Sequence, residues 1–402
     1  MKKNVVYVAL SVFGVQGAVY LGQFILAGML PADQFAIVRT AEASLQLLSA
    51  IAPLGVSLLV VRLAAQTTDS QSLGRSLSSY LAFALVAGIA VAGICSLLIG
   101  TFGQRDSDPY LLGMVWVLVL TNVSRTALNF LYGKERFATV SVTNFAIALC
   151  YLAALVALVK LVGLPGWIGA KYLIETAFLV VSLAFVWRHL GRVIASARLY
   201  AELAREGFAV SLSLLFRTGL DTMPLLILAY LGASDQEVAT LGLCTLIVAA
   251  VMILPTSINT ILLPKYNTLT TRDPKALPAL HARYQTLHAI FGAFLAALIT
   301  LAACVLNDKF PHRFENIVPM LALLSASIPL KAVGSLNANA LFSKKQTKTG
   351  TKIHGIAFAA SITSITLLTP KYAIWGAIAP AVAIEIITAA LLIHFNKKTL
   401  VT

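Results

Sequence analysis

The stretch SSYLAFALVAGIAVAGICSLLIGT, residues 78–101, decides the fold class. It has 24 residues, and none of them is charged. A helix needs about 20 apolar residues to cross the hydrocarbon core of a bilayer. In lipid the backbone polar groups must also bond within the protein, which a helix achieves. The stretch therefore predicts a membrane-spanning helix.

The composition of the whole chain extends this prediction. The 402 residues are 59% hydrophobic and 11% charged, with a mean hydropathy of +0.87. Soluble domains carry about 25% charged residues. The sequence therefore predicts an all-α polytopic membrane protein and excludes an ordinary soluble domain.

Twelve apolar runs are long enough to span a membrane. The first run is too long for the apolar core of a signal peptide and lacks a convincing cleavage site, so we expect an uncleaved first helix. The predicted spans are residues 5–30, 35–63, 78–101, 110–133, 139–160, 165–187, 207–231, 236–264, 284–306, 315–343, 350–369 and 372–395.

The basic residues predict the orientation. Of the 30 Lys and Arg residues, 20 lie at the two termini and the even-numbered connections, and five lie at the other connections. Cytoplasmic loops carry the excess of Lys and Arg, so we expect both termini in the cytoplasm of a bacterial cell, with the chain in the plasma membrane. The net charge of +14 then reflects this bias and an attraction to membrane lipids, not nucleic acid.

The chain is predicted to consist of two halves. Asp33–Gln34 and Asp235–Gln236 are 202 residues apart, and so are Pro53 and Pro255. Two features at one offset favour two six-helix lobes, residues 1–187 and 207–402, around a central cavity. Between them, residues 188–206 contain apolar residues at helical spacing and four arginines, which predicts an amphipathic helix on the cytoplasmic surface.

Charged residues inside the spans are the candidate functional residues. A charge at mid-bilayer costs roughly 2.5–3.5 kcal/mol, so such residues should face the bundle interior or a wet cavity. They are Arg39, Glu42, Arg125, Lys171, Glu175, Arg217, Asp221, Lys331 and Glu385.

Six of these residues form three pairs at helical spacing, in which both side chains share a helix face. In each pair the base precedes the acid, which is the less favourable order for a helical ion pair. The pairs either only lower the cost of insertion or hold functional charges, and the sequence leaves both open. They are Arg39/Glu42, Lys171/Glu175 and Arg217/Asp221.

Other polar and special residues allow two interpretations each. Gln16, Tyr20 and Gln23 form a polar stripe that either lines a cavity or bonds to other helices. Pro53 and Pro255 are either hinges for alternating access or static bends.

The sequence argues against an enzyme and predicts no metal or cofactor. It contains no Walker A loop for nucleotide hydrolysis, and the outer loops are short for a glycan polymerase or ligase. The four cysteines lie in apolar runs without metal-ligand spacing, and we expect them to be buried apolar side chains: Cys95, Cys150, Cys244 and Cys304.

Three segments resemble a known family. They are Phe35–Gln66, Arg125–Leu149 and Phe216–Leu269, which are similar to span two, spans four to five and spans seven to eight of Wzx-like, O-antigen-type polysaccharide flippases. These flippases belong to the multidrug/oligosaccharidyl-lipid/polysaccharide (MOP) exporter superfamily. The matching features of the last segment are Asp221, Gly242-Leu243 and Leu263-Pro264-Lys265.

The resemblance implies a function. It implies export of undecaprenyl-pyrophosphate-linked oligosaccharide for O-antigen, capsule or exopolysaccharide, with a polysaccharide polymerase and a chain-length regulator as possible partners. A cationic cavity would receive the anionic head group, because Arg contacts phosphate in bidentate geometry. Two alternatives stay open: an ion-coupled drug exporter of the same superfamily, and a membrane glycan polymerase or ligase.

The resemblance also suggests a role for each charged candidate. Arg39 and Arg217 are the first candidates for head-group contact, and Lys331 is the third. Glu42 and Asp221 would hold the arginines or carry a coupling proton, and Lys171 and Glu175 are assigned to charge pairing or ion coupling. Glu385 is either a proton relay or the partner of a base on another helix.

Overall fold

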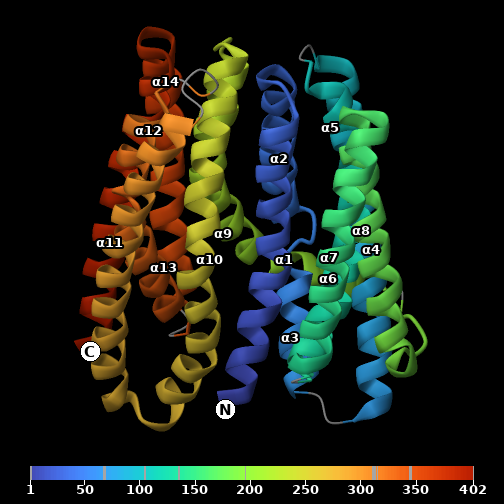
Figure 1. Ribbon diagram of the computed structural model, residues 1–402. Coiled ribbons are helices and arrows are strands. Elements are labelled where there is room, and N and C mark those ends of the chain that lie inside the picture. The colour runs from blue at the N-terminus through green and yellow to red at the C-terminus, as the bar shows by residue number, and fades with distance from the viewer. Residues whose placement is uncertain are drawn as a thin grey trace. The chain divides into compact units, whose positions relative to one another are not determined.

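The computed structural model describes residues 2–66, 69–103, 106–134, 136–194, 196–309, 314, 316–343 and 346–401. All regular structure in these residues is helical (Figure 1). The chain divides into two compact units. Unit 1 comprises Met1–Gly28 and Ala41–Leu215, and unit 2 comprises Met29–Thr40 and Phe216–Thr402.

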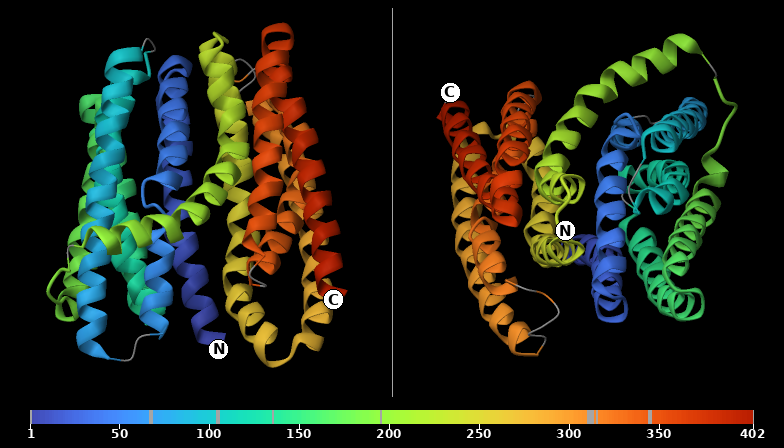
Figure 2. Two further views of the ribbon diagram at one scale, coloured as in Figure 1. Left: turned by 180° about the vertical axis from the view of Figure 1, so that it is seen from behind. Right: turned by 90° about the horizontal axis from the view of Figure 1, so that it is seen from above.

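Unit 1 is a bundle in which α6, α7 and α8 pack side by side (Figure 1). The start of α9 runs across the bundle rather than along it (Figure 2), and its Leu203 packs against Val56 and Phe83. The helices that lie in unit 1 or enter it are α1 (Lys2–Met29), α2 (Ala32–Ile51), α3 (Val56–Gln66), α4 (Ser70–Phe102), α5 (Asp108–Val115), α6 (Val117–Gly133), α7 (Phe137–Val162), α8 (Leu164–Val186), the 3-10 turn η1 (Trp187–His189) and α9 (Ala197–Tyr230).

Unit 2 contains the beginning of α2, the end of α9 and the remaining helices. Its helix α13 packs against α10, α11 and α14. The backbone of α14 is non-helical at Ala373, with φ 48° and ψ −129°, so α14 consists of two helices. The elements are α10 (Asp235–Arg272), η2 (Pro274–Ala276), α11 (Leu277–Lys309), α12 (Ile317–Ser325), α13 (Ile328–Ser343) and α14 (Thr347–Val401).

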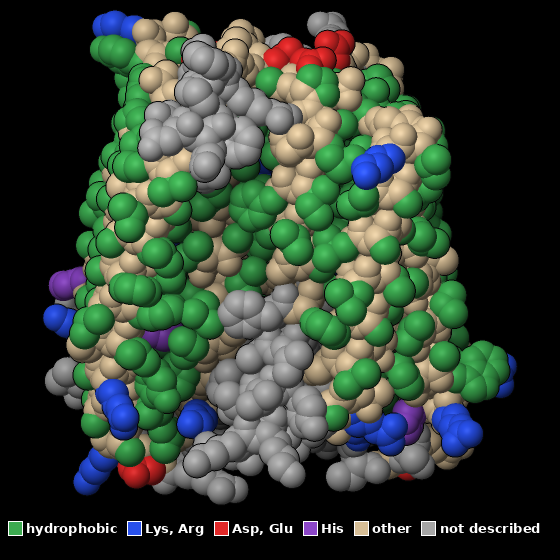
Figure 3. Space-filling model, viewed as in Figure 1, with side chains coloured by type: hydrophobic (Ala, Val, Ile, Leu, Met, Phe, Trp, Pro, Cys, Tyr) green, Lys and Arg blue, Asp and Glu red, His purple; other side chains and the backbone are tan. Residues whose placement is uncertain are grey.

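The surface of these helices suits lipid. In the described part of the chain, nine helical segments are long and apolar enough to cross a membrane. Large apolar side chains such as Leu97, Leu161 and Ile356 are exposed. On the face in Figure 3, apolar side chains cover the middle, whereas most Lys and Arg side chains lie near the lower edge. The protein is thus a multi-pass membrane protein.

Two of the four cysteines correct the prediction that all are buried. Cys244 is buried and Cys95 partly so, whereas Cys150 and Cys304 are exposed. A membrane helix exposes apolar side chains to lipid, so an apolar run does not by itself imply burial.

The predicted span 35–63 is interrupted near Pro53. Helix α2 ends at Ile51 and α3 begins at Val56, with positive φ angles at Leu54 (42°) and Gly55 (70°). Proline lacks the N–H that would continue the helical ladder. Pro255, by contrast, lies inside the continuous helix α10. The hinge role of both prolines stays a prediction.

The offset of 202 residues, from which two halves were predicted, has one local counterpart in the structure. Asp33 and Asp235 both lie in the first turn of a helix, at the starts of α2 and α10. A carboxylate there interacts favourably with the positive end of the helix dipole.

The predicted amphipathic helix over residues 188–206 is wrong in its first part. Residues 190–194 are not helical, and α9 begins only at Ala197. The backbone N–H groups of Gly191 and Ile194 instead donate to the hydroxyls of Ser78 and Ser79 on α4, at 3.0 and 2.9 Å. These bonds replace the helical hydrogen bonds that the apolar spacing had predicted.

A close backbone contact fixes the interruption of span two. An ideal Cβ on Gly207 of α9 would lie 1.7 Å from the carbonyl oxygen of Leu54, and one on Gly55 would lie 2.5 Å from the oxygen of Gly207. Only glycine allows the two chains to approach this closely.

We therefore expect Gly207→Ala to destabilise unit 1 by about 3 kcal/mol, because backbone would have to move. The measurements are the amount of folded protein in membranes and the thermal midpoint in detergent. Gly93→Ala is the control, since nothing lies within 4 Å of a Cβ there. Equal stability of the two variants would contradict the close contact.

Candidate functional site

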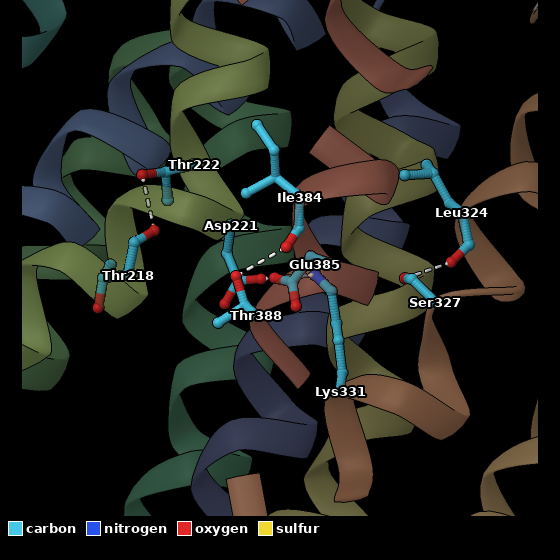
Figure 4. A network of polar contacts seen from close by, with 9 residues as sticks. All are labelled: Thr218, Asp221, Thr222, Leu324, Ser327, Lys331, Ile384, Glu385 and Thr388. Atoms are coloured by element: carbon cyan, nitrogen blue, oxygen red, sulfur yellow. Dashed lines mark hydrogen bonds and ion pairs between the residues drawn. The ribbon is translucent and has the colours of Figure 1, made fainter. Parts of the chain in front are cut away.

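A lysine between two carboxylates forms the main charged site of unit 2 (Figure 4). The Nζ of Lys331 on α13 lies 2.6 Å from Oδ1 of Asp221 on α9 and 3.4 Å from Oε1 of Glu385 on α14. The side chain of Asp221 is 50% exposed, whereas those of Lys331 and Glu385 are 19% and 16% exposed. One ammonium thus connects three helices, and one of its two partners is open to a neighbouring molecule.

A break between α12 and α13 positions Lys331. Helix α12 ends at Ser325 and α13 begins at Ile328, so Lys331 lies in the first turn of α13. Its backbone N–H donates to the carbonyl oxygen of Ser327 at 2.8 Å. The N-terminus of a helix carries a partial positive charge. The ammonium and the helix end therefore both attract anionic groups.

Two Gly–Phe contacts hold α9 against α14 beside this site. An ideal Cβ on Gly219 would lie 2.2 Å from the ring of Phe358, and one on Gly355 would lie 2.9 Å from the ring of Phe216. The two ring centroids are 5.4 Å apart. This packing fixes the turn of α9 that carries Asp221.

The structure corrects the predicted pairing of Arg217 with Asp221. Asp221 pairs with Lys331, and among the described residues no carboxylate lies within ion-pair distance of Arg217. The base-first order is unfavourable within a helix, whereas a base on another helix can approach directly. Of the two interpretations of Glu385, the structure shows the partner on another helix, which is Lys331.

Unit 1 contains a second ion pair between helices. The Nζ of Lys171 on α8 lies 2.8 Å from Oε1 of Glu42 on α2, and it donates to Oε2 at 3.0 Å. The indole Nε1–H of Trp167 donates to Oε1 of Glu42 at 3.1 Å. Lys171 therefore takes Glu42 at ion-pair distance and not the predicted Glu175.

Arg39 and Glu42 fall in different units, because the boundary lies between Thr40 and Ala41. Within unit 2, the buried side chain of Arg39 packs against Gly242 of α10. An ideal Cβ on Gly242 would lie 2.7 Å from Cγ of Arg39. The Gly-Leu motif of this span thus makes room for the arginine.

The three residues of the predicted polar stripe on α1 differ in their burial. Gln16 is exposed, Tyr20 is partly buried, and Gln23 is buried. Its role as a cavity lining stays a prediction.

Sequence reasoning missed two polar features. Trp167 lies four residues before Lys171, and this spacing could have placed it beside the same partner. The second feature is a buried network in which the hydroxyl of Tyr266 lies 3.1 Å from Nδ1 of His281. Its four members come from four helices, so no spacing along the chain indicates it: Tyr266, His281, Asn337 and Asn396.

Comparison with known families identifies the relatives of the chain. Residues 1–264 match the family described as polysaccharide biosynthesis protein. The chain belongs to this family. Among curated proteins, none matches the sequence significantly.

Solved structures show the fold of this polysaccharide biosynthesis family member. An inward-facing multidrug resistance MATE family transporter of the MOP superfamily has a TM-score of 0.80 at 12% identity, covering 99% of this chain and 98% of that one. The eukaryotic MATE transporter AtDTX14 has a TM-score of 0.76 at 16% identity, covering 98% and 95%. The predicted fold class, an all-α polytopic membrane protein, is confirmed.

The chain thus combines membership of the polysaccharide biosynthesis family with a fold that is also found in transporters. A further solved structure, MATE in the straight conformation, has a TM-score of 0.74 at 14% identity and covers 99% of this chain and 96% of that one. At these identities the likeness establishes the fold and leaves the substrate open.

We expect Glu42→Gln to lower the stability of unit 1 by about 3–5 kcal/mol, because it leaves the buried ammonium of Lys171 without its counter-charge. Glu42→Gln combined with Lys171→Met should recover most of this loss. Unfolding in detergent measures both variants.

The control is Glu202→Gln, which removes a surface pair with Arg198 whose side chains are 50% and 90% exposed. It should change stability by less than about 1 kcal/mol. A similar effect of Glu202→Gln and Glu42→Gln would contradict the importance of the buried pair.

Proposed function

We propose that the protein is a flippase. It moves undecaprenyl-pyrophosphate-linked oligosaccharide units from the inner to the outer leaflet of the bacterial plasma membrane by alternating access. The units serve the synthesis of a surface polysaccharide such as O-antigen, capsule or exopolysaccharide. The family match over residues 1–264 and the MATE-like fold support this proposal.

The observation that carries the proposal is the position of Arg217 in unit 2. Lys331 takes both carboxylates, so Arg217 has no carboxylate at ion-pair distance in the described part of the chain. A charge inside a membrane span is costly and is retained for a function. A pyrophosphate is a multiply charged anion that a guanidinium binds with two parallel hydrogen bonds.

Arg39 is a second contact for the head group in this proposal. It is buried in unit 2 against Gly242, where surrounding protein restrains its stem. A restrained arginine loses less side-chain entropy when it binds an anion.

A second candidate is an ion-coupled exporter of cationic small molecules. The similarity to MATE transporters supports it, and so does the half-exposed carboxylate of Asp221, which could bind a cation. A glycan polymerase or ligase has no comparable support.

The genetic test compares the two candidates. Deletion of the gene should abolish a surface polysaccharide and leave lipid-linked repeat units on the inner leaflet. Normal polysaccharide with altered resistance to cationic dyes would favour the exporter and overturn the flippase.

Complementation of the deletion tests the head-group residues. Arg217→Ala and Arg39→Ala should each reduce polysaccharide export at least tenfold, because each removes a charge-assisted contact to phosphate. Protein levels in the membrane should stay at the wild-type value. Arg192→Ala is the matched control, since Arg192 is exposed outside the helices. Full export in both test variants would remove their assignment.

The proposed orientation has its own test. Both termini and residues 190–194 should be cytoplasmic, as the distribution of Lys and Arg predicts. A single cysteine at position 193, in a chain lacking the four native cysteines, should react with an impermeant thiol reagent only after the cells are opened. Labelling in intact cells would reverse the topology.

A further inference from the structure

A short exposed segment follows the end of α8 in unit 1, and helix α4 holds its backbone. The N–H of Gly191 donates to the carbonyl oxygen of Gly74 at 3.2 Å and to the hydroxyl of Ser78 at 3.0 Å. An ideal Cβ on Gly74 would lie 2.8 Å from the carbonyl oxygen of His189. Because α4 fixes this backbone, the segment presents its side chains from a position that is set before any partner binds.

Basic residues from three parts of unit 1 lie around His189. Arg188 precedes it in the chain, and Lys134 and Arg136 interact with it electrostatically. Arg75 is next in the chain to the glycine that contacts the carbonyl of His189. The three arginines are exposed, and the lysine is partly buried. We call these four cations, together with His189, the His189 surface.

The acidic residues beside these cations do not balance them. Residues 187–194 contain no acidic residue. Asp69, which interacts electrostatically with Arg75, caps α4 and accepts two backbone N–H groups of that helix at 3.2 and 2.9 Å. Glu135 lies between two of the cations in the sequence, outside the residues that the structure describes. Four cations against these two acids give an excess of positive charge, which favours an anionic partner.

The place of the His189 surface in the fold favours a lipid as that partner. The apolar segment Leu164–His189 is long enough to cross a membrane, so the cations lie where a span ends. Trp187 and Ile194 beside them are 72% and 48% exposed. Tryptophan is enriched at the boundary between hydrocarbon and head groups, and basic residues there attract anionic lipids. Exposed apolar side chains beside cations thus match a phospholipid, in which a phosphate adjoins acyl chains.

We propose that the His189 surface binds the head group of an anionic phospholipid. Arg136 and Arg188 contact the phosphate, because a guanidinium can donate two parallel hydrogen bonds to phosphate oxygens. Trp187 packs against the acyl chains next to the head group. The bound lipid is a resident of the membrane and not the transported molecule, so this site does not depend on the proposed substrate. In the proposed orientation the lipid belongs to the cytoplasmic leaflet.

Lipid binding to the purified full-length protein in mild detergent tests this site, with native mass spectrometry as the measurement. Dioleoyl phosphatidylglycerol should bind about tenfold more tightly than dioleoyl phosphatidylcholine, which has no net charge. Arg136→Gln combined with Arg188→Gln should weaken phosphatidylglycerol binding about tenfold, because two charged contacts to phosphate are lost. Phosphatidylcholine binding should stay unchanged. If the wild type does not prefer phosphatidylglycerol, the proposal is wrong.

The matched control removes the same charge at other exposed positions. Lys160 lies in the last turn of α7, at the opposite end of that helix from Arg136, and Lys371 lies on α14 in unit 2. Lys160→Gln combined with Lys371→Gln should bind phosphatidylglycerol like the wild type. An equal loss in both double variants would mean that the lipid responds to net charge alone, which would overturn the site.

Salt dependence gives a second measurement. The preference for phosphatidylglycerol should fall toward one between about 0.05 M and about 0.5 M NaCl, because salt screens exposed charges. A preference that salt leaves unchanged would come from the apolar contacts and would contradict the role of the arginines.

The thermal midpoint in detergent checks that the variants fold. If the double variant does not fold, Arg136→Gln and Arg188→Gln should each weaken phosphatidylglycerol binding about threefold. Undiminished binding in both single variants would exclude the lipid and leave the surface to another anionic partner, such as an acidic protein.

Discussion

The high free energy of a lone charge in a membrane is the constraint on which the candidate sites depend. A buried ion without a partner costs several kcal/mol, so each embedded ammonium of these sites has a carboxylate within reach. Lys331 meets this requirement by joining α9, α13 and α14, and Lys171 meets it by joining α2 and α8. The ion pairs therefore specify which helices must be neighbours, and the apolar side chains fill the space between them.

Close packing at glycine residues determines how near the helices lie to one another, which the ion pairs leave undetermined. Without a strong hydrophobic force between helices in lipid, small residues at the contacts decide how closely the helices approach. Gly219 and Gly355 each receive a phenylalanine ring, and Gly242 receives the stem of Arg39. These glycines set the positions from which the charged side chains extend. A larger residue at any of them would move a charge as well as a helix.

The helical class and most helix positions could be predicted from the sequence, because length and apolarity are local properties. The interruption at Leu54–Gly55 and the extended segment over residues 190–194 could not. Both depend on contacts with distant parts of the chain, namely the carbonyl of Leu54 against Gly207 and two serines of α4. Apolar spacing predicted a helix for residues 190–194, and hydrogen bonds to another helix prevented it. Tertiary hydrogen bonds thus outweighed the local pattern.

The sequence also indicated the charged residues of the candidate site but not their partners. Helical spacing identifies neighbours on one helix, and it therefore paired Arg217 with Asp221 and Lys171 with Glu175. In the structure both pairs are replaced by contacts between helices. Such contacts depend on how helices pack, which no spacing along one segment encodes. The i,i+4 rule found residues that share a face and could not decide what that face meets.

The two ion pairs differ in how far their side chains are exposed. The pair of Glu42 and Lys171 is buried on both sides, with side chains 10% and 11% exposed, and Trp167 occupies a further acceptor position of the carboxylate. If this pair broke, water would hydrate neither charge, so the pair is suited to holding helices together. The pair of Asp221 and Lys331 has one half-exposed member, and a second carboxylate, that of Glu385, lies 3.4 Å from the same ammonium. The same requirement for neutrality thus joins two helices in unit 1 and three helices in unit 2.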